Sequence, residues 1–125
     1  MARDALVLLE NHGDTLPLKK TQTVALIGPL ADSPVDMLGS WSAVGVAEQA
    51  VTLRKGMQAA LQGRGKLLFA QGANVTDDAH VIDYLNQLNW DRPEVVQDKR
   101  TPQAMLEEAV RVARQADVIV AAVGE

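Results

Sequence analysis

The chain has 125 residues with 12 basic and 16 acidic side chains, a formal net charge of −4, and 47% of its residues are hydrophobic. This composition is typical of one folded domain, and it lacks the basic excess expected of a nucleic-acid-binding protein. The absence of cysteine excludes disulfides, thiolate metal sites and a cysteine nucleophile. No apolar run approaches the roughly 20 residues that span a bilayer, so no membrane segment is expected.

The first half of the chain predicts a helix, a strand and a second helix. Residues 5–9 are apolar and are followed by Asn11 and Gly13, which indicates a short helix with a left-handed end. Residues 23–27 (TVALI) are apolar and rich in β-branched side chains, which is typical of a fully buried strand. Thr52 is expected to cap a helix that continues to about residue 62.

The second half predicts strands over residues 66–71 (KLLFAQ) and 117–123 (DVIVAAV), with two helices between them. The first helix is predicted over residues 77–88, and Thr101 followed by Pro102 predicts the start of the second. The apolar stripe of this second helix consists of Met105, Ala109, Val112 and Ala116. Its solvent-exposed face is expected to hold ion pairs among Glu107, Glu108, Arg111 and Arg114.

Continuous apolar strands that alternate with helices indicate parallel pairing with right-handed crossovers. The predicted fold class is therefore α/β, a three-layer sandwich with a mainly parallel sheet and helices on both faces. A doubly wound domain usually covers its last strand with a further helix, and here residues 117–123 are followed only by Gly124 and Glu125. Residues 1–125 are accordingly expected to form a single, partial α/β-sandwich domain.

Each predicted strand is followed closely by a glycine: Gly28, Gly72 and Gly124. In open α/β sheets, ligands bind beyond the carboxyl ends of the strands, where glycine permits sharp turns and close approach of the backbone. The long connection over residues 28–50 begins at this edge and carries Ser40, Trp41 and Ser42. An indole with hydroxyls on either side suits a sugar ring, whose C–H face stacks on aromatics while its hydroxyls form hydrogen bonds.

Trp41, Ser40 and Ser42 are therefore the predicted substrate-binding residues. From spacing alone, the alternative that Trp41 fills the core or a domain interface is favoured. Asp32 and Asp36 lie on the same connection, as paired carboxylates or as turn caps, and the capping role is favoured.

Metal and cofactor sites are not expected. His12 and His80 are isolated from other potential ligands in the sequence, so no metal site is predicted. The segment after residue 27 lacks the lysine of a phosphate-binding loop and the glycine pattern of a dinucleotide fold, so no nucleotide or other cofactor is predicted.

Four segments in this order resemble a known domain: "ARDALVLLEN…DTLPL", "VALIGPLAD", "GSWSAVG…VTLRKGMQAAL" and "EEAVRVARQADVIVAAVGE". Together they resemble the second domain of family 3 glycoside hydrolases, most closely in bacterial periplasmic members that are β-glucosidases. The resemblance implies a periplasmic parent protein with an N-terminal (β/α)₈ barrel before this domain. It also implies that the active site lies between the two domains.

For that parent, the resemblance implies retaining hydrolysis of terminal non-reducing β-D-glucosyl residues in a β-glucoside or oligosaccharide. The nucleophile would be an aspartate of the barrel, and the acid/base glutamate would follow a strand like residues 117–123. Glu125 is not assigned that role, and no catalytic residue is expected within this chain. Trp41 matches the position where some relatives place a tryptophan that stacks on the sugar.

Two further expectations follow. The chain alone is expected to be inactive, and the open edge of the strand at residues 117–123 can pair with a second copy to form a homo-oligomer. The alternative to a glycosidase fragment is a stand-alone, non-catalytic binding or interaction module of flavodoxin-like shape.

Overall fold

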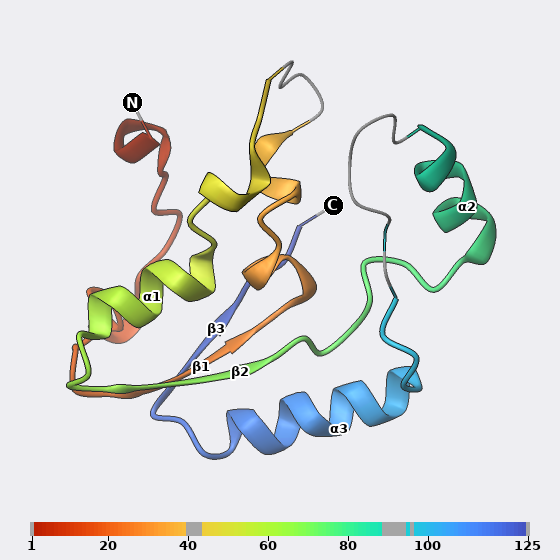
Figure 1. Cartoon of the computed structure of the whole chain (residues 1–125). Coiled ribbons are helices and arrows are strands. Elements are labelled where there is room, and N and C mark those ends of the chain that lie inside the picture. The colour runs from red at the N-terminus through yellow and green to blue at the C-terminus, as the bar shows by residue number, and fades with distance from the viewer. Residues whose placement is uncertain (1, 40–43, 89–94, 96, 125) are drawn as a thin grey trace.

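The computed structural model describes residues 2–39, 44–88, 95 and 97–124 (Figure 1). Its three strands are β1 (Thr23–Ile27), β2 (Lys66–Ala70) and β3 (Val118–Ala121). They form one parallel sheet in the order β2-β1-β3. The predicted strand over residues 23–27 is confirmed with the same bounds, while the other two predicted strands are each shorter than expected.

The central strand forms the core of the sheet because it has a neighbour on each side. Val24, Ala25 and Leu26 of β1 have no exposed surface, as expected for an apolar strand covered on both faces. Ala25 lies in register with Leu68 of β2 and with Ile119 of β3.

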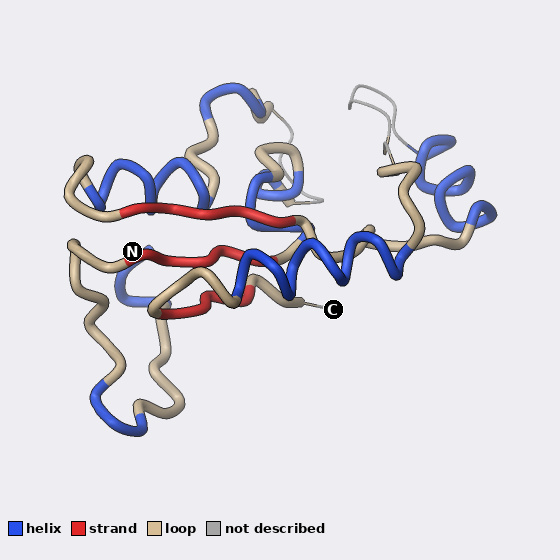
Figure 2. Tube along the Cα trace, turned by 90° about the horizontal axis from the view of Figure 1, so that it is seen from below, coloured by secondary structure: helices blue, strands red, loops and turns tan. Residues whose placement is uncertain are grey.

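Helices cover the two faces of the sheet, so the chain has three layers (Figures 1 and 2). Helix α1 (Leu53–Leu61) packs on β2 at one face, and α3 (Pro102–Ala113) packs on β2 and β1 at the other. The predicted α/β sandwich with a parallel sheet is therefore confirmed.

Both predicted helix caps of the covering helices are confirmed. The Thr52 side chain accepts a hydrogen bond from the Lys55 amide at the start of α1, and the Thr101 side chain accepts one from the Ala104 amide at the start of α3. In α3, Met105 and Ala109 are buried against the sheet, as the apolar stripe predicts.

Helix α2 (Ala79–Leu88) covers neither face and lies beyond the carboxyl end of the sheet (Figures 1 and 2). It begins two residues later than predicted because the Asp78 carboxylate accepts hydrogen bonds from the amides of His80 and Val81 and so caps the helix. Of its described side chains, only Ile82 is buried.

The predicted helix over residues 5–9 is wrong. The structure has a 3₁₀ turn at Ala2–Ala5, and Leu6–Glu10 have no regular secondary structure. Leu6 is 81% exposed and Leu9 is 92% exposed, so this segment buries little apolar surface. A helix this short is not stable in water without a packing partner, which explains the difference.

Candidate functional site at the carboxyl edge of the sheet

Because the three strands are parallel, the chain leaves all of them at the same edge (Figure 1). The connection after β1 leads to α1 on one face, whereas β3 follows α3 on the other face. The order β2-β1-β3 therefore reverses its direction between β1 and β3. In doubly wound sheets such a reversal opens a crevice at the carboxyl ends of the two strands, and ligands bind there.

Gly28 lies at this reversal and leaves no room for a side chain. Its φ is +142°, and a Cβ atom on it would lie 2.1 Å from the carbonyl oxygen of Ala122. The Gly28 amide donates to the carbonyl of Ala70, and the Ala122 amide donates to that of Ile27. The backbones that leave the three strands thus run side by side, as predicted for a glycine at this edge.

The glycines after the other two strands differ in how closely their surroundings pack against them. Gly72 has a φ of +79°, and a Cβ atom on it would approach Ile27 Cγ2 to 3.1 Å, so this position also favours glycine. At Gly124 a Cβ atom would make only an ordinary contact of 3.6 Å with Leu30 Cδ1. Close packing therefore does not require glycine after β3.

Asp32 joins the two ends of the long connection between β1 and α1. Thr52 Oγ1 donates a 2.8 Å hydrogen bond to Asp32 Oδ1, and Arg54 Nη1 donates one of 2.9 Å to Asp32 Oδ2. The Arg54 guanidinium carbon also lies 4.4 Å from the centre of the Phe69 ring on β2, at cation–π distance. The carboxylate is thereby linked through Arg54 to the sheet.

Asp32 and Asp36 do not form a catalytic pair of carboxylates. The partners of Asp32 are Thr52 and Arg54, while Asp36 Oδ2 accepts a 2.5 Å hydrogen bond from the hydroxyl of Ser33. The local contact of Asp36 agrees with the favoured capping interpretation, whereas among the described residues Asp32 caps no local turn and instead contacts residues at the far end of the connection. The Asp32–Arg54 ion pair could not be predicted from the sequence because a long connection separates the two residues.

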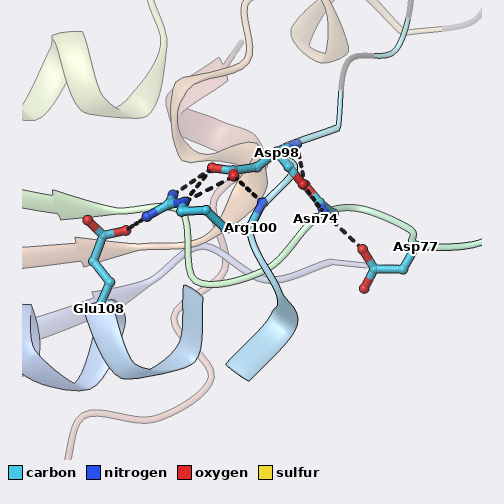
Figure 3. A network of polar contacts seen from close by, with 5 residues as sticks. All are labelled: Asn74, Asp77, Asp98, Arg100 and Glu108. Carbon is cyan, nitrogen blue, oxygen red and sulfur yellow. Dashed lines mark hydrogen bonds and ion pairs between the residues drawn. The ribbon is translucent and has the colours of Figure 1, made fainter. Parts of the chain in front are cut away.

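A second polar network orders the connection between β2 and α3 (Figure 3). Asn74 Nδ2 donates to the carbonyl oxygen of Asp98 and to Asp77 Oδ1, and the Asp98 amide donates to Asn74 Oδ1. Arg100 bridges the carboxylates of Asp98 and Glu108, each at 2.6 Å. These contacts attach residues 97–100 both to the segment after β2 and to the second turn of α3.

This network also corrects the expected ion pairs on α3, because Glu108 pairs with Arg100 from outside the helix. Hydrogen bonds from Arg100 lower the pKa of Asp98 below its ordinary value. The hydrogen bonds of Arg100 to Asp98 and Glu108 raise the pKa of Arg100, so the guanidinium is charged at every accessible pH. The arrangement neutralises a cation that would otherwise lie unfavourably at the start of a helix.

The described residues hold no group of three or more histidine, aspartate or glutamate side chains with metal-binding geometry. His12 pairs with Glu10 at 2.9 Å, and His80 is exposed at the start of α2. Among the helices that the structure describes, none has the length and apolar character needed to cross a membrane.

The predicted substrate-binding residues Ser40, Trp41 and Ser42 lie outside the described residues, and so does Glu125. The described parts of the same connection leave the sheet at Gly28, at the reversal point, and return to α1 through Thr52. The two described ends of this connection therefore meet near the edge where ligands bind in this class of sheet.

Part of the sheet face on the α3 side is uncovered. Ile119 of β3 shares this face with Ala25 and is 54% exposed, because α3 packs on β2 and β1. On α3 itself, a shallow groove of about 590 Å³ is lined by side chains that include Leu106 and Val110. This groove, which is also lined by polar and charged side chains, lies on a covering helix and not at the carboxyl edge.

The strand order and the helices on both faces define a doubly wound α/β sandwich. Residues 6–125 match the sequence profile of the glycosyl hydrolase family 3 C-terminal domain, and the chain belongs to this family.

Two curated relatives show how much of a longer protein the chain matches. It is 53% identical over its whole length to a periplasmic beta-glucosidase of Salmonella typhimurium, of which it spans 16%. It is 37% identical over 62% of its length to a xylan 1,4-beta-xylosidase of Xylanibacter ruminicola, of which the match covers 9%. The chain thus corresponds to a small part of each of these proteins.

Solved structures agree with the fold. A beta-glucosidase from intestinal bacteria, described as involved in saponin metabolism, superimposes with a TM-score of 0.62 and 31% identity. That match covers 94% of this chain and 17% of the other. A beta-glucosidase from Listeria innocua in complex with glucose superimposes with a TM-score of 0.57 and 26% identity, over 95% of this chain and 13% of the other.

Proposed function

We propose that this chain supplies one wall of the sugar-binding site of a retaining β-glucosidase that hydrolyses terminal non-reducing β-D-glucosyl residues. The observation that carries the proposal is the 53% identity, over the whole chain, to a periplasmic beta-glucosidase. The periplasm is the proposed compartment of the full-length protein for the same reason. The proposed partner is an N-terminal barrel domain of that protein, and the proposed substrate is a β-glucoside or oligosaccharide.

The position of the long connection supports this role. Its first residue, Gly28, lies at the reversal between β1 and β3, where doubly wound sheets bind their ligands. Trp41 on this connection is the proposed stacking surface for the sugar, and Ser40 and Ser42 are the proposed hydrogen-bonding groups. A wall of this kind binds and orients the substrate, and the reaction takes place against the facing domain.

The chemistry requires a second wall. Retaining hydrolysis uses two carboxyl groups about 5–5.5 Å apart, one as the nucleophile and one as the acid and then the base. In the described part of the chain, two carboxylates of the connections at the carboxyl edge are held by structural partners: Asp32 by Thr52 and Arg54, and Asp98 by Arg100. The chain alone is therefore expected to be inactive.

The exposed N-terminal segment also supports a large partner domain. Leu6, Val7, Leu8 and Leu9 are consecutive, and each is more than half exposed. Contiguous exposed apolar surface is typical of an interaction site.

The decisive experiment compares the isolated chain with the full-length protein on an aryl β-glucoside. We expect no turnover by the chain, in a preparation shown to be free of host glucosidase, and turnover by the full-length protein. Trp41→Ala in the full-length protein should raise KM roughly tenfold through loss of sugar stacking. Trp90→Ala removes the other tryptophan of this chain and is the matched control.

If the isolated chain shows turnover and a substitution within it abolishes that turnover, the proposal that catalysis requires a second domain is refuted. If the full-length protein also lacks glycosidase activity, the chain is instead a non-catalytic binding or interaction module of flavodoxin-like shape. Equal effects of Trp41→Ala and Trp90→Ala would remove the sugar-contacting role of Trp41.

A further inference from the structure

We propose that Asp32 is a positioning residue that closes the base of the connection between β1 and α1. In the full-length enzyme it would thereby hold the segment that carries Trp41 in place; this consequence rests on the proposed function, whereas the closure itself does not. The relevant contact is the hydrogen bond from Thr52 Oγ1 to Asp32 Oδ1, which joins residues 20 positions apart.

The closure is anchored in the core on both sides. Ala31, next to Asp32, has no exposed surface, and Thr52 is 1% exposed. The Thr52 oxygen accepts from the Lys55 amide while its single proton is donated to Asp32. The hydroxyl therefore caps α1 and fixes the carboxylate at the same time.

The second carboxylate oxygen uses a different partner. Asp32 Oδ2 accepts from Arg54, and the Arg54 guanidinium lies over the Phe69 ring of β2. Ionised partners make this hydrogen bond stronger than a neutral one. One side chain thus ties the outgoing end of the connection to the helix start and, through Arg54, to the sheet.

Asp36 offers a matched comparison on the same connection. Among the described residues its carboxylate accepts only from Ser33, three positions away, so this contact shapes a local turn and does not join the two ends. A closing role for Asp32 predicts that its loss affects the whole connection, while loss of Asp36 affects only the nearby turn.

Amide hydrogen exchange of the 125-residue chain, followed by mass spectrometry, tests the closure without any sugar. In Asp32→Ala we expect exchange in peptides from residues 33–51 to rise about tenfold, because a hydrogen bond to a charged group is lost. Exchange in β1 and β2 should change little. Asp32→Asn keeps an acceptor for Thr52 and should give a smaller increase, and Asp36→Ala should affect only peptides around residues 33–38.

Two results would overturn the closure: unchanged exchange over residues 33–51 in Asp32→Ala, or an equal rise throughout β1 and β2, which would make Asp32 a residue of global stability. If Asp32→Ala does not fold, Asp32→Asn and Arg54→Met replace it. Combined, these two substitutions should raise exchange no more than Arg54→Met alone, since both remove the same ion pair. Fully additive effects would contradict the proposal.

The consequence for substrate is measured separately. In the full-length enzyme, Asp32→Ala should raise KM for an aryl β-glucoside several-fold with a smaller change in kcat, and Asp32→Asn should restore part of the loss. Faster exchange with an unchanged KM would retain the closure and refute the role of the connection in sugar binding.

Discussion

A Cβ atom placed on Gly28 would lie 2.1 Å from the carbonyl oxygen of Ala122, so the chain leaving β1 passes directly against the chain leaving β3. This contact lies at the reversal of strand order, the point from which the long connection starts. A side chain at residue 28 would separate the two backbones and disturb the site as well as the sheet.

Gly28→Ala should therefore lower the free energy of unfolding by at least about 3 kcal/mol, from backbone strain and overpacking together. Urea unfolding measures the change. Gly13→Ala is the matched control, because Gly13 also has a positive φ, of +66°, but no neighbour within 4 Å of its Cβ position. It should cost about 1 kcal/mol. Equal losses in the two variants would mean that contact with Ala122 is unimportant.

Adjacent positions on α3 separate core packing from surface. Met105 has no exposed surface and Leu106 is 53% exposed. Met105→Ala should cost about 2–5 kcal/mol of stability through the cavity that it leaves, whereas Leu106→Ala should cost below about 1 kcal/mol. Chemical unfolding of both variants measures the difference. A larger loss from Leu106→Ala would show that the other flank of α3 faces the core.

The Asp98–Arg100 pair should make stability sensitive to acid. Arg100 lowers the pKa of Asp98 below its ordinary value of 3.8, while Arg100 itself does not titrate in this range. A carboxyl group whose pKa is depressed on folding stabilises the fold above its unfolded pKa. This contribution is lost as the pH falls through the lower, folded pKa.

The stability difference between the wild type and Asp98→Asn should therefore be constant from neutral pH to about pH 4 and shrink below it. Unfolding midpoints in urea, measured across this range, give the difference. Asp83→Asn, an exposed position on α2 outside the network, serves as the control. A difference that persists unchanged well below pH 3.8 would show that the ionisation of Asp98 does not contribute.

Self-association through the open side of β3 is the fourth prediction. β3 is an edge strand, and Ile119 on it is 54% exposed, so a second copy can pair with this strand and cover its apolar face. Sedimentation of the isolated chain should show dimers or larger species at high concentration, and Ile119→Lys should reduce them. Val75→Lys changes an exposed valine away from the sheet and should have no such effect. A wild-type chain that stays monomeric would contradict the prediction.

Elements with strong local signals were predicted correctly. The run at residues 23–27 is a strand because its continuous apolar side chains suit burial on both faces, and Thr101 with Pro102 starts α3 because both residues favour a helix start. The helix over residues 5–9 failed because its apolar pattern has no surface to pack against in the described structure. A short apolar pattern in the sequence forms a helix only where tertiary packing can stabilise that helix.

The candidate site likewise has features that the sequence predicts and features that it does not. Glycines at the carboxyl edge, a long connection from β1 and the family resemblance were all visible in the sequence. The links from Asp32 to Thr52 and Arg54, and from Arg100 to Glu108, were not. These pairs join residues that are distant in the chain or on different elements, and no periodic pattern in the sequence indicates such contacts.

Residue type, local spacing and order along the chain were enough to predict the α/β class, the parallel pairing, the helix caps and the membership of family 3. The folded structure was needed to show that β1 lies between β2 and β3, that Gly28 lies against Ala122, and that Asp32 joins the two ends of the connection after β1. These relationships depend on which surfaces are buried together when the chain folds, and distances between sequentially remote atoms exist only in the folded state.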